Sequence, residues 1–375
     1  MTIFMPIDQA TPATDILDVI GVGFGPSNIA VAIAQEELAP DLTALFLEKR
    51  PAFGWHDTMM FPNATMQVNF LKDLVSFRNP RSSFSFVNFL HDNDRLADFT
   101  NLQTMFPRRV EFHQYLGWCA AKFEHKVTYG ADVHEIDRVT VGGEDLYRVR
   151  FTTSAGQTER FARTVVHSGG LEPNIPFVTC TSDRISHGYH ILDSVKDHAE
   201  GAHYAVVGGG QSAAEIVQFL YARGAKVSAI VSRFGYMPAD DSPFVNQIFD
   251  PDQVDQFFFT SSETRGKIHD LHAVTNYAGV DGDLLQEIYA DWYQDRITGE
   301  NRLDFNRMCR VTGATGTSDG VRMTLDNALN STRTEMQADY LICATGFHAR
   351  SVLGLMSPNL RASAVQDEKQ NPVFD

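Results

Sequence analysis

The chain has 375 residues, of which 43% are hydrophobic and 21% are charged, a composition typical of a folded globular protein with two or three domains. Its 31 basic and 47 acidic residues give a net charge of -16, which argues against partners such as nucleic acids or anionic membranes. The four cysteines form no CxxC pair, which excludes a dithiol redox motif and a cysteine-rich metal site.

The N-terminus is predicted to be a polar leader over residues 1–14. It lacks the basic and apolar regions of a signal peptide, and no apolar run in the chain approaches the ~20 residues of a membrane helix. Together with the scattered thiols, this predicts a cytoplasmic protein.

The first predicted elements are a strand, a glycine turn with the sequence GVGFGPSN, a helix and a second strand. Gly21 permits the tight turn, and Gly23 lets the backbone approach a pyrophosphate. Gly25 and Pro26 open the helix, whose N–H groups face the phosphate charge. Glu48 ends the second strand, where a carboxylate can bind ribose hydroxyls. The pattern predicts a dinucleotide site, the alternative being a glycine-rich turn of purely structural use.

Strand-like runs follow over residues 126–166, and the sequence AHYAVVGGGQSAAE then begins a second strand–turn–helix unit. No acid closes its next strand. Ser232 and Arg233 stand there instead, and they would bind a 2′-phosphate that an acid would repel. This favours NADPH over NADH, unless Arg233 is only a solvated loop charge. The nucleotide-binding residues predicted in the turn are Gly208, Gly210, Gln211 and Ser212.

The remaining segments are a region of loops and helices over residues 234–300 and a buried strand that ends in the turn ATGF. This turn is similar to the one that closes over the flavin in enzymes with two dinucleotides, and Ala344, Thr345 and Gly346 are assigned to the NADP-binding set. Two dinucleotides in one chain suggest a flavin beside a nicotinamide, with oxygen or a diffusible molecule as the electron acceptor.

The predicted fold is α/β, with two Rossmann-like doubly wound dinucleotide-binding domains and a small helical substrate region. Residues 1–170, completed by about 336–375, form the expected FAD-binding domain. Residues 171–233, completed by about 301–335, form the expected NADPH-binding domain, and residues 234–300 form the helical substrate-binding region.

At this point the chain resembles the flavin-dependent N-hydroxylating monooxygenases, which act on L-ornithine or L-lysine in siderophore and related pathways. The resemblance is carried by the two glycine turns and by FGWHDTMMFPNATMQVNFLKDLVSFRNPRSSFSFVNFLH, DDSPFVNQIFDP and TNYAGVDGDLL. It implies that NADPH reduces FAD, and that the reduced flavin reacts with O2 to give a C4a-hydroperoxide that hydroxylates the side-chain amine. The RNP after FLKDLVSF favours L-ornithine, with L-lysine or a diamine as alternatives.

The resemblance also implies site residues. It places Trp55, His56 and Gln67 beside the flavin, whereas His56, like His187, is equally explained as a hydrogen-bonded packing residue. Lys72 matches the lysine that pairs with the substrate's α-carboxylate, and Gln67 and Lys72 are counted among the catalytic residues. Two asparagines match those that hold the amino acid end of the substrate, and they are also counted among the catalytic residues: Asn246 and Asn276.

Two further features bear on the activity. The apolar stretch around Trp55, Met59, Met66 and Phe70 either excludes water from the flavin or is ordinary core. The family's C-terminal segment over flavin and substrate has no counterpart before Asp375. We therefore keep as alternatives an uncoupled NADPH oxidase and a non-catalytic nucleotide-binding relative. The sequence leaves the formation of a homo-oligomer open.

Overall fold

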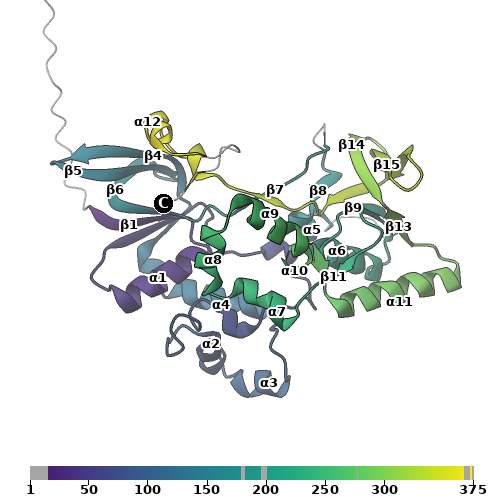
Figure 1. Cartoon of the computed structure of the whole chain (residues 1–375), viewed down its shortest axis with the longest axis horizontal. Coiled ribbons are helices and arrows are strands. Elements are labelled where there is room, and N and C mark those ends of the chain that lie inside the picture. The colour runs from purple at the N-terminus through teal and green to yellow at the C-terminus, as the bar shows by residue number, and fades with distance from the viewer. Residues whose placement is uncertain (1–15, 179–181, 196–200, 277, 367–371, 374–375) are drawn as a thin grey trace, which may run out of the picture. The chain divides into compact units, whose positions relative to one another are not determined.

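The computed structural model describes residues 16–178, 182–195, 201–276, 278–366 and 372–373, and it divides into two compact units (Figure 1). The predicted leader over residues 1–14 and Cys180 lie outside the described residues. Unit 1 comprises Met1–Trp55, Thr65–Leu171 and Ala349–Asp375, and unit 2 comprises His56–Ala64 and Glu172–His348.

Unit 1 contains a six-stranded sheet with the order β3-β2-β1-β6-β5-β4. The first four strands in this order are parallel, and β6, β5 and β4 are antiparallel neighbours. Strand β1 is central because every residue from Val19 to Val22 pairs on both sides, with β2 and with β6. The strands are β1 (Leu17–Val22), β2 (Ala44–Glu48), β3 (Val127–Tyr129), β4 (Asp132–Val141), β5 (Glu144–Thr153) and β6 (Gly156–His167).

The helices of unit 1 surround an aromatic core in which Phe86 and Tyr115 are fully buried, with ring centroids 5.5 Å apart. Burial of such rings supplies much of the stabilisation of this unit. The helices are α1 (Pro26–Leu38), α2 (Phe86–Asp92), α3 (Leu96–Asn101), α4 (Arg109–Ala121) and α12 (Pro358–Ser363), with the short 3-10 helices η2 (Phe70–Lys72), η3 (Glu124–Lys126) and η6 (Val352–Gly354).

Unit 2 contains a parallel five-stranded sheet with the order β13-β10-β9-β17-β8. An antiparallel meander of three strands, β14-β15-β16, and a short parallel pair, β11 and β12, complete its strands. The chain passes between the units at four points: after Trp55, after Ala64, within β7 (Leu171–Pro173) and within β18 (Phe347–Ala349). The other strands are β8 (Ile185–His187), β9 (His203–Val207), β10 (Lys226–Val231), β11 (Met237–Pro238), β12 (Gly279–Val280), β13 (Leu303–Arg307), β14 (Cys309–Thr317), β15 (Gly320–Asn327), β16 (Thr332–Ala338) and β17 (Tyr340–Cys343).

Helix α6 of unit 2 packs against β9 and β10 on one side and against α11 on another (Figure 1). Its inward residues, among them Ile216 and Val217, are fully buried. The helices are α5 (Ile191–Ser194), α6 (Gln211–Ala222), α7 (Pro243–Asn246), α8 (Gln253–Phe259), α9 (Ser262–Leu271), α10 (Ala273–Asn276) and α11 (Gly282–Thr298), with η1 (Asp57–Met59), η4 (Gly188–His190) and η5 (Gln247–Phe249).

The domain boundaries differ from the prediction in three places. Residues 56–64, expected in the first domain, belong to unit 2 because Met59 and Phe61 are buried in its core. Residues 336–348, expected to complete the first domain, belong to unit 2 because β17 pairs with β9 and β8. The helical region over 234–300 is part of unit 2 as well, and it includes the two short strands β11 and β12.

Candidate functional site

The glycine turn of unit 1 follows the central strand β1 and passes very close to the next turn of the sheet. Gly23 has a φ of +87°, and a Cβ built there would lie 2.6 Å from the carbonyl oxygen of Ser168, which follows β6. A Cβ on Gly21 would collide with the ring of Phe46. Both glycines are therefore required by the protein itself, before any ligand is considered.

Polar side chains fix this turn from two sides. The Glu48 carboxylate accepts hydrogen bonds from the N–H of Phe24 at 2.7 Å and from the N–H of Arg50 at 2.9 Å. The buried amide of Asn28 donates to the carbonyl of Gly23 at 2.6 Å. Glu48 thus holds the turn in shape, and a carboxylate has further lone pairs with which to accept from ribose hydroxyls.

The start of α1 is open. Its N-cap is Gly25, no side chain caps the helix end, and Pro26 occupies its first turn. A Cβ on Gly25 would meet nothing within 4 Å. The packing of the protein leaves room for a side chain at this position. A phosphate that approaches the helix N–H groups would need this space, which explains a glycine here. These residues fit the pyrophosphate of a dinucleotide such as FAD.

Unit 2 repeats the arrangement. Gly208 follows β9, and a Cβ there would collide with the carbonyl of Ala344, which follows the neighbouring strand β17. The N-cap of α6 is Gly210, again without a side-chain cap, and Ser212 lies in the first turn. A Cβ on Gly209 would point into open space. This turn fits a second dinucleotide, at the point of the sheet where the strand order reverses.

The turn over Ala344–Gly346 therefore lies beside the glycine turn of unit 2. Asn174 anchors it, because the Thr345 hydroxyl donates to the carbonyl of Asn174 and the Asn174 backbone N–H donates to the carbonyl of Gly346 at 3.0 Å. The Nε2 atom of His187, a buried residue, lies 2.9 Å from the same carbonyl. Asn174 and Ser168 were missed as site-forming residues. The sequence signal that could have indicated them is their position directly after strands, Ser168 after β6 and Asn174 after β7.

Arg233 and Ser232 lie directly after β10, as expected. Ser232 is exposed and Arg233 is half-buried. One guanidinium nitrogen of Arg233 donates to the carbonyl of Ala278 at 3.1 Å. A guanidinium carries five N–H donors, so the remaining ones can bind a phosphate. Arg233 is thus more than a solvated loop charge.

Lys72 is held by its neighbours in sequence. It ends the 3-10 helix η2, which is capped by the Asn69 side chain through a 2.9 Å bond to the N–H of Leu71. The adjacent Asp73 accepts from the backbone N–H groups of Ser76 and Phe86, both at 2.7 Å, and so ties this segment to the start of α2. Lys72 itself is half-buried.

The other flavin-side candidates are divided between the units. Gln67 is an exposed residue in a loop of unit 1 whose backbone is bonded to residues 105–107. The carbonyl of Trp55 lies 2.9 Å from Nδ1 of His113 in unit 1. His56 belongs to unit 2, where its ring lies 5.8 Å from that of Tyr189.

The apolar stretch is core in both units. Trp55, Met66 and Phe70 pack against the aromatic core of unit 1. Met59 is buried in the core of unit 2. These contacts agree with the interpretation of the stretch as packing residues.

The substrate asparagines lie in unit 2. Asn246 ends α7, and its amide donates to the carbonyl of Asp241 at 2.7 Å, which leaves its oxygen available as an acceptor. Asn276 ends α10, three positions before the first residue of β12, Gly279. The described residues thus place Lys72 in one unit and both asparagines in the other.

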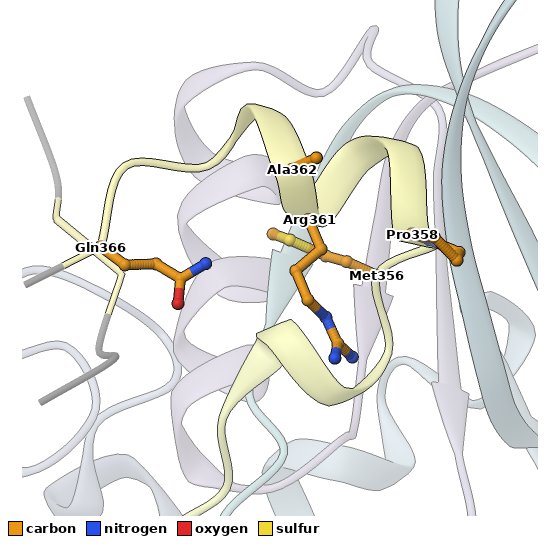
Figure 2. Close-up of a pocket in the computed structure, with 5 residues that line it drawn as sticks. All are labelled: Met356, Pro358, Arg361, Ala362 and Gln366. Atoms are coloured by element: carbon orange, nitrogen blue, oxygen red, sulfur yellow. The ribbon is translucent and has the colours of Figure 1, made fainter.

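A pocket of about 440 Å3 lies beside α12 in unit 1 (Figure 2). Its lining contains none of the predicted site residues and only one charged group, so it offers no acid, base or nucleophile. It is lined by Met356, Pro358, Arg361, Ala362 and Gln366.

Among the described residues, no cluster of three or more His, Cys, Asp or Glu side chains could hold a metal ion. No described helix is long and apolar enough to cross a membrane.

In each unit, parallel strands lead through a glycine turn into a helix with an open N-terminus, an arrangement that defines a protein with two dinucleotide-binding folds. The chain belongs to the L-lysine 6-monooxygenase/L-ornithine 5-monooxygenase family, whose model matches residues 15–349. The L-ornithine N(5)-monooxygenase of Pseudomonas aeruginosa is 38% identical over 364 residues, an alignment that covers 93% of this chain and 82% of that protein.

Solved structures agree. The ornithine N-hydroxylase of Kutzneria sp. 744, in the form FADred-NADP+-L-orn, superposes with a TM-score of 0.92 at 39% identity, covering 96% of this chain and 88% of that one. The L-lysine 6-monooxygenase of Pseudomonas syringae superposes with a TM-score of 0.80 at 29% identity, and the alignment covers 96% of this chain and 87% of that one. The predicted family and the two Rossmann-like folds are confirmed.

The two glycines of the first turn should respond differently to a methyl group. Gly23→Ala should lower the melting temperature of the apoprotein by at least about 3 °C, because a positive φ costs an alanine about 1–2 kcal/mol and the Ser168 carbonyl is too close. Gly25→Ala should leave that temperature unchanged but weaken FAD binding by at least about 10-fold. Thermal unfolding and FAD titration measure both. Wild-type FAD affinity in Gly25→Ala would show that the open space is not the phosphate site.

His187 should make unit 2 sensitive to acid. Its Nδ1 accepts from the N–H of Tyr189 at 3.1 Å, so the proton sits on Nε2, toward Gly346. Burial lowers the pKa of His187 below 6.5, so its contribution to stability is present above pH 6.5 and is lost as pH falls through the folded-state pKa.

The loss of melting temperature between pH 7.5 and 5 should therefore be smaller in His187→Gln than in the wild type, as measured by circular dichroism. His91→Gln, at an exposed position, serves as the control and should keep the wild-type slope. Equal slopes in all three proteins would contradict the role given to His187.

Proposed function

We propose that the protein is an NADPH- and FAD-dependent monooxygenase that hydroxylates the side-chain amine of L-ornithine. The observation that carries this proposal is the 38% identity to an L-ornithine N(5)-monooxygenase over 93% of the chain, together with two open phosphate-binding turns. The reaction balances as amine, O2, NADPH and one proton giving the hydroxylamine, water and NADP+. The N-hydroxy amino acid would serve siderophore or related biosynthesis.

Bound FAD, once reduced, supplies the activation of O2, and the protein supplies binding and orientation. Glu48 and the N-terminus of α1 would hold the FAD, and the N-terminus of α6 with Ser232 and Arg233 would hold the NADPH. Lys72, Asn246 and Asn276 would hold the amino acid end of the substrate.

The substrate amine must lose a proton before it can accept oxygen. Its pKa in water is near 10.4, and burial near a positive charge lowers that value. By pairing with the α-carboxylate, the Lys72 ammonium would cancel the negative charge that otherwise raises the pKa of the amine.

The decisive experiment is to measure hydroxylamine formed per NADPH consumed with L-ornithine, L-lysine and putrescine. Near-stoichiometric product with L-ornithine supports the proposal. NADPH consumption with H2O2 as the only product would identify an oxidase instead, and a preparation that binds no FAD would identify a non-catalytic relative.

Arg233 should determine the choice of nicotinamide cofactor. Arg233→Ala should raise KM for NADPH by about 10- to 100-fold, the loss expected for one charge-assisted hydrogen bond. KM for NADH should stay nearly constant because NADH has no 2′-phosphate. Arg223→Ala provides a matched control, since Arg223 lies at the other end of α6 over the ring of Phe219. Equal effects on both cofactors would mean that the bond from Arg233 to Ala278 matters more than the phosphate.

Lys72 should recognise the α-carboxylate. Lys72→Ala should raise KM for L-ornithine by about 10- to 100-fold and spare putrescine, which has no carboxylate. Reduction of the flavin by NADPH should be unaffected. Lys122→Ala, at the exposed end of α4, is the control. If the variant lost activity equally on both amines, the carboxylate role would be excluded.

A further inference from the structure

The segment that follows Asn276 is attached to two sides of the proposed NADPH site. We call residues 278–282, which contain β12 and the start of α11, the asparagine corner. Two side chains from nucleotide-binding segments bond to it: Gln211, the first residue of α6, and Arg233, which follows β10. Helix α6 contacts α11 and β12, and β12 in turn contacts α10, all within unit 2 (Figure 1).

The Gln211 side chain makes a two-way bridge to the corner. Its oxygen accepts from the backbone N–H of Asp281 at 2.9 Å, and its nitrogen donates to the Asp281 carboxylate at 2.9 Å. The same nitrogen donates to Glu215 at 3.0 Å. Both N–H donors of the amide and one lone pair of its oxygen are therefore used, and the amide cannot rotate without breaking all three bonds.

The bridge lies where a ligand would act on it. Gln211 is the first residue of the helix whose uncapped N-terminus fits the dinucleotide phosphates, and its partner Asp281 is the N-cap of α11. The Asp281 carboxylate makes no capping bond to its own helix, because it faces Gln211. A shift of the α6 terminus on phosphate binding would thus be passed to the residues that follow Asn276.

We infer that Gln211 is a positioning residue that couples NADP+ binding to substrate binding, an inference that rests on the proposed function. With the phosphates bound, the N-terminus of α6 is fixed, and the bridge fixes the asparagine corner in turn. NADP+ then increases the affinity for L-ornithine, and L-ornithine increases the affinity for NADP+ by the same factor.

The chain offers a matched control on the same two helices. Gln218, two turns further along α6, donates to Glu287 and to Asp291 of α11, both at 2.8 Å. This second bridge joins α6 to α11 away from the glycine turn and from the asparagine corner. A variant at Gln218 therefore tests whether loss of helix packing alone changes the coupling.

The experiment measures the dissociation constant of L-ornithine from the oxidised FAD-bound enzyme by calorimetry, with and without saturating NADP+. In the wild type NADP+ should tighten binding by at least about 5-fold. Gln211→Leu should reduce this ratio by at least about 3-fold, whereas Gln218→Leu should keep it. Asp281→Ala removes the carboxylate half of the bridge and should also reduce the ratio, and the double variant should lose little more than Gln211→Leu.

Several outcomes would overturn the inference. These are a wild-type ratio near one, an unchanged ratio in both Gln211→Leu and Asp281→Ala, or equal losses in Gln211→Leu and Gln218→Leu. A failure of the proposed function looks different, because the wild type would then bind no L-ornithine under either condition.

Discussion

The structure depends on one close approach, which occurs once in each unit. At the carboxyl end of the central strand, the glycine turn passes so near the turn after the neighbouring strand that only hydrogen fits: Gly23 against Ser168, and Gly208 against Ala344. This approach directs the chain into α1 and α6 with their N-termini at the point where the strand order of the sheet reverses. The packing leaves the first N–H groups of both helices without a side-chain cap. These N–H groups are therefore available to bind a phosphate.

Most of the local structure could be predicted because its signals lie close together in the sequence. The helix from Pro26 and the helix from Gln211 begin where the glycine spacing places them, and both glycine turns follow buried strands. The strands of residues 126–166 were evident from their alternation. Each of these features is determined within some thirty residues of chain, the span of a βαβ unit.

The domain assignment of two segments could not be predicted, because it depends on contacts between distant residues. Phe61 belongs to unit 2 through its contact with Phe219, at 4.8 Å between ring centroids. Strand β17 belongs there through its register with β9, in which Tyr340 pairs with Tyr204. An apolar strand or an aromatic residue has the same sequence signature in either core, so neither assignment was visible in the sequence.

In the candidate site too, the sequence could not predict contacts between distant residues. The sequence predicted ligand roles for several polar residues, but not their bonds within the protein: Glu48 accepts from Phe24, Arg233 donates to Ala278, and His187 accepts from Tyr189. Partly buried polar groups need partners whether or not a ligand is bound. A residue beside a ligand therefore commonly has a second, structural contact, which sequence patterns do not reveal.

The glutamine at position 211 illustrates how such a contact restricts the choice of residue. Its amide must accept from the backbone N–H of Asp281 and donate to two carboxylates, those of Asp281 and Glu215. A lysine could donate but not accept, and a glutamate could accept but would add a third negative charge beside the expected phosphates. An amide meets both demands without changing the charge at the start of α6, in a chain whose net charge of -16 already opposes anion binding. The helix N–H groups and Arg233 then remain to attract the phosphates, while Gln211 keeps the corner that follows Asn276 attached to them.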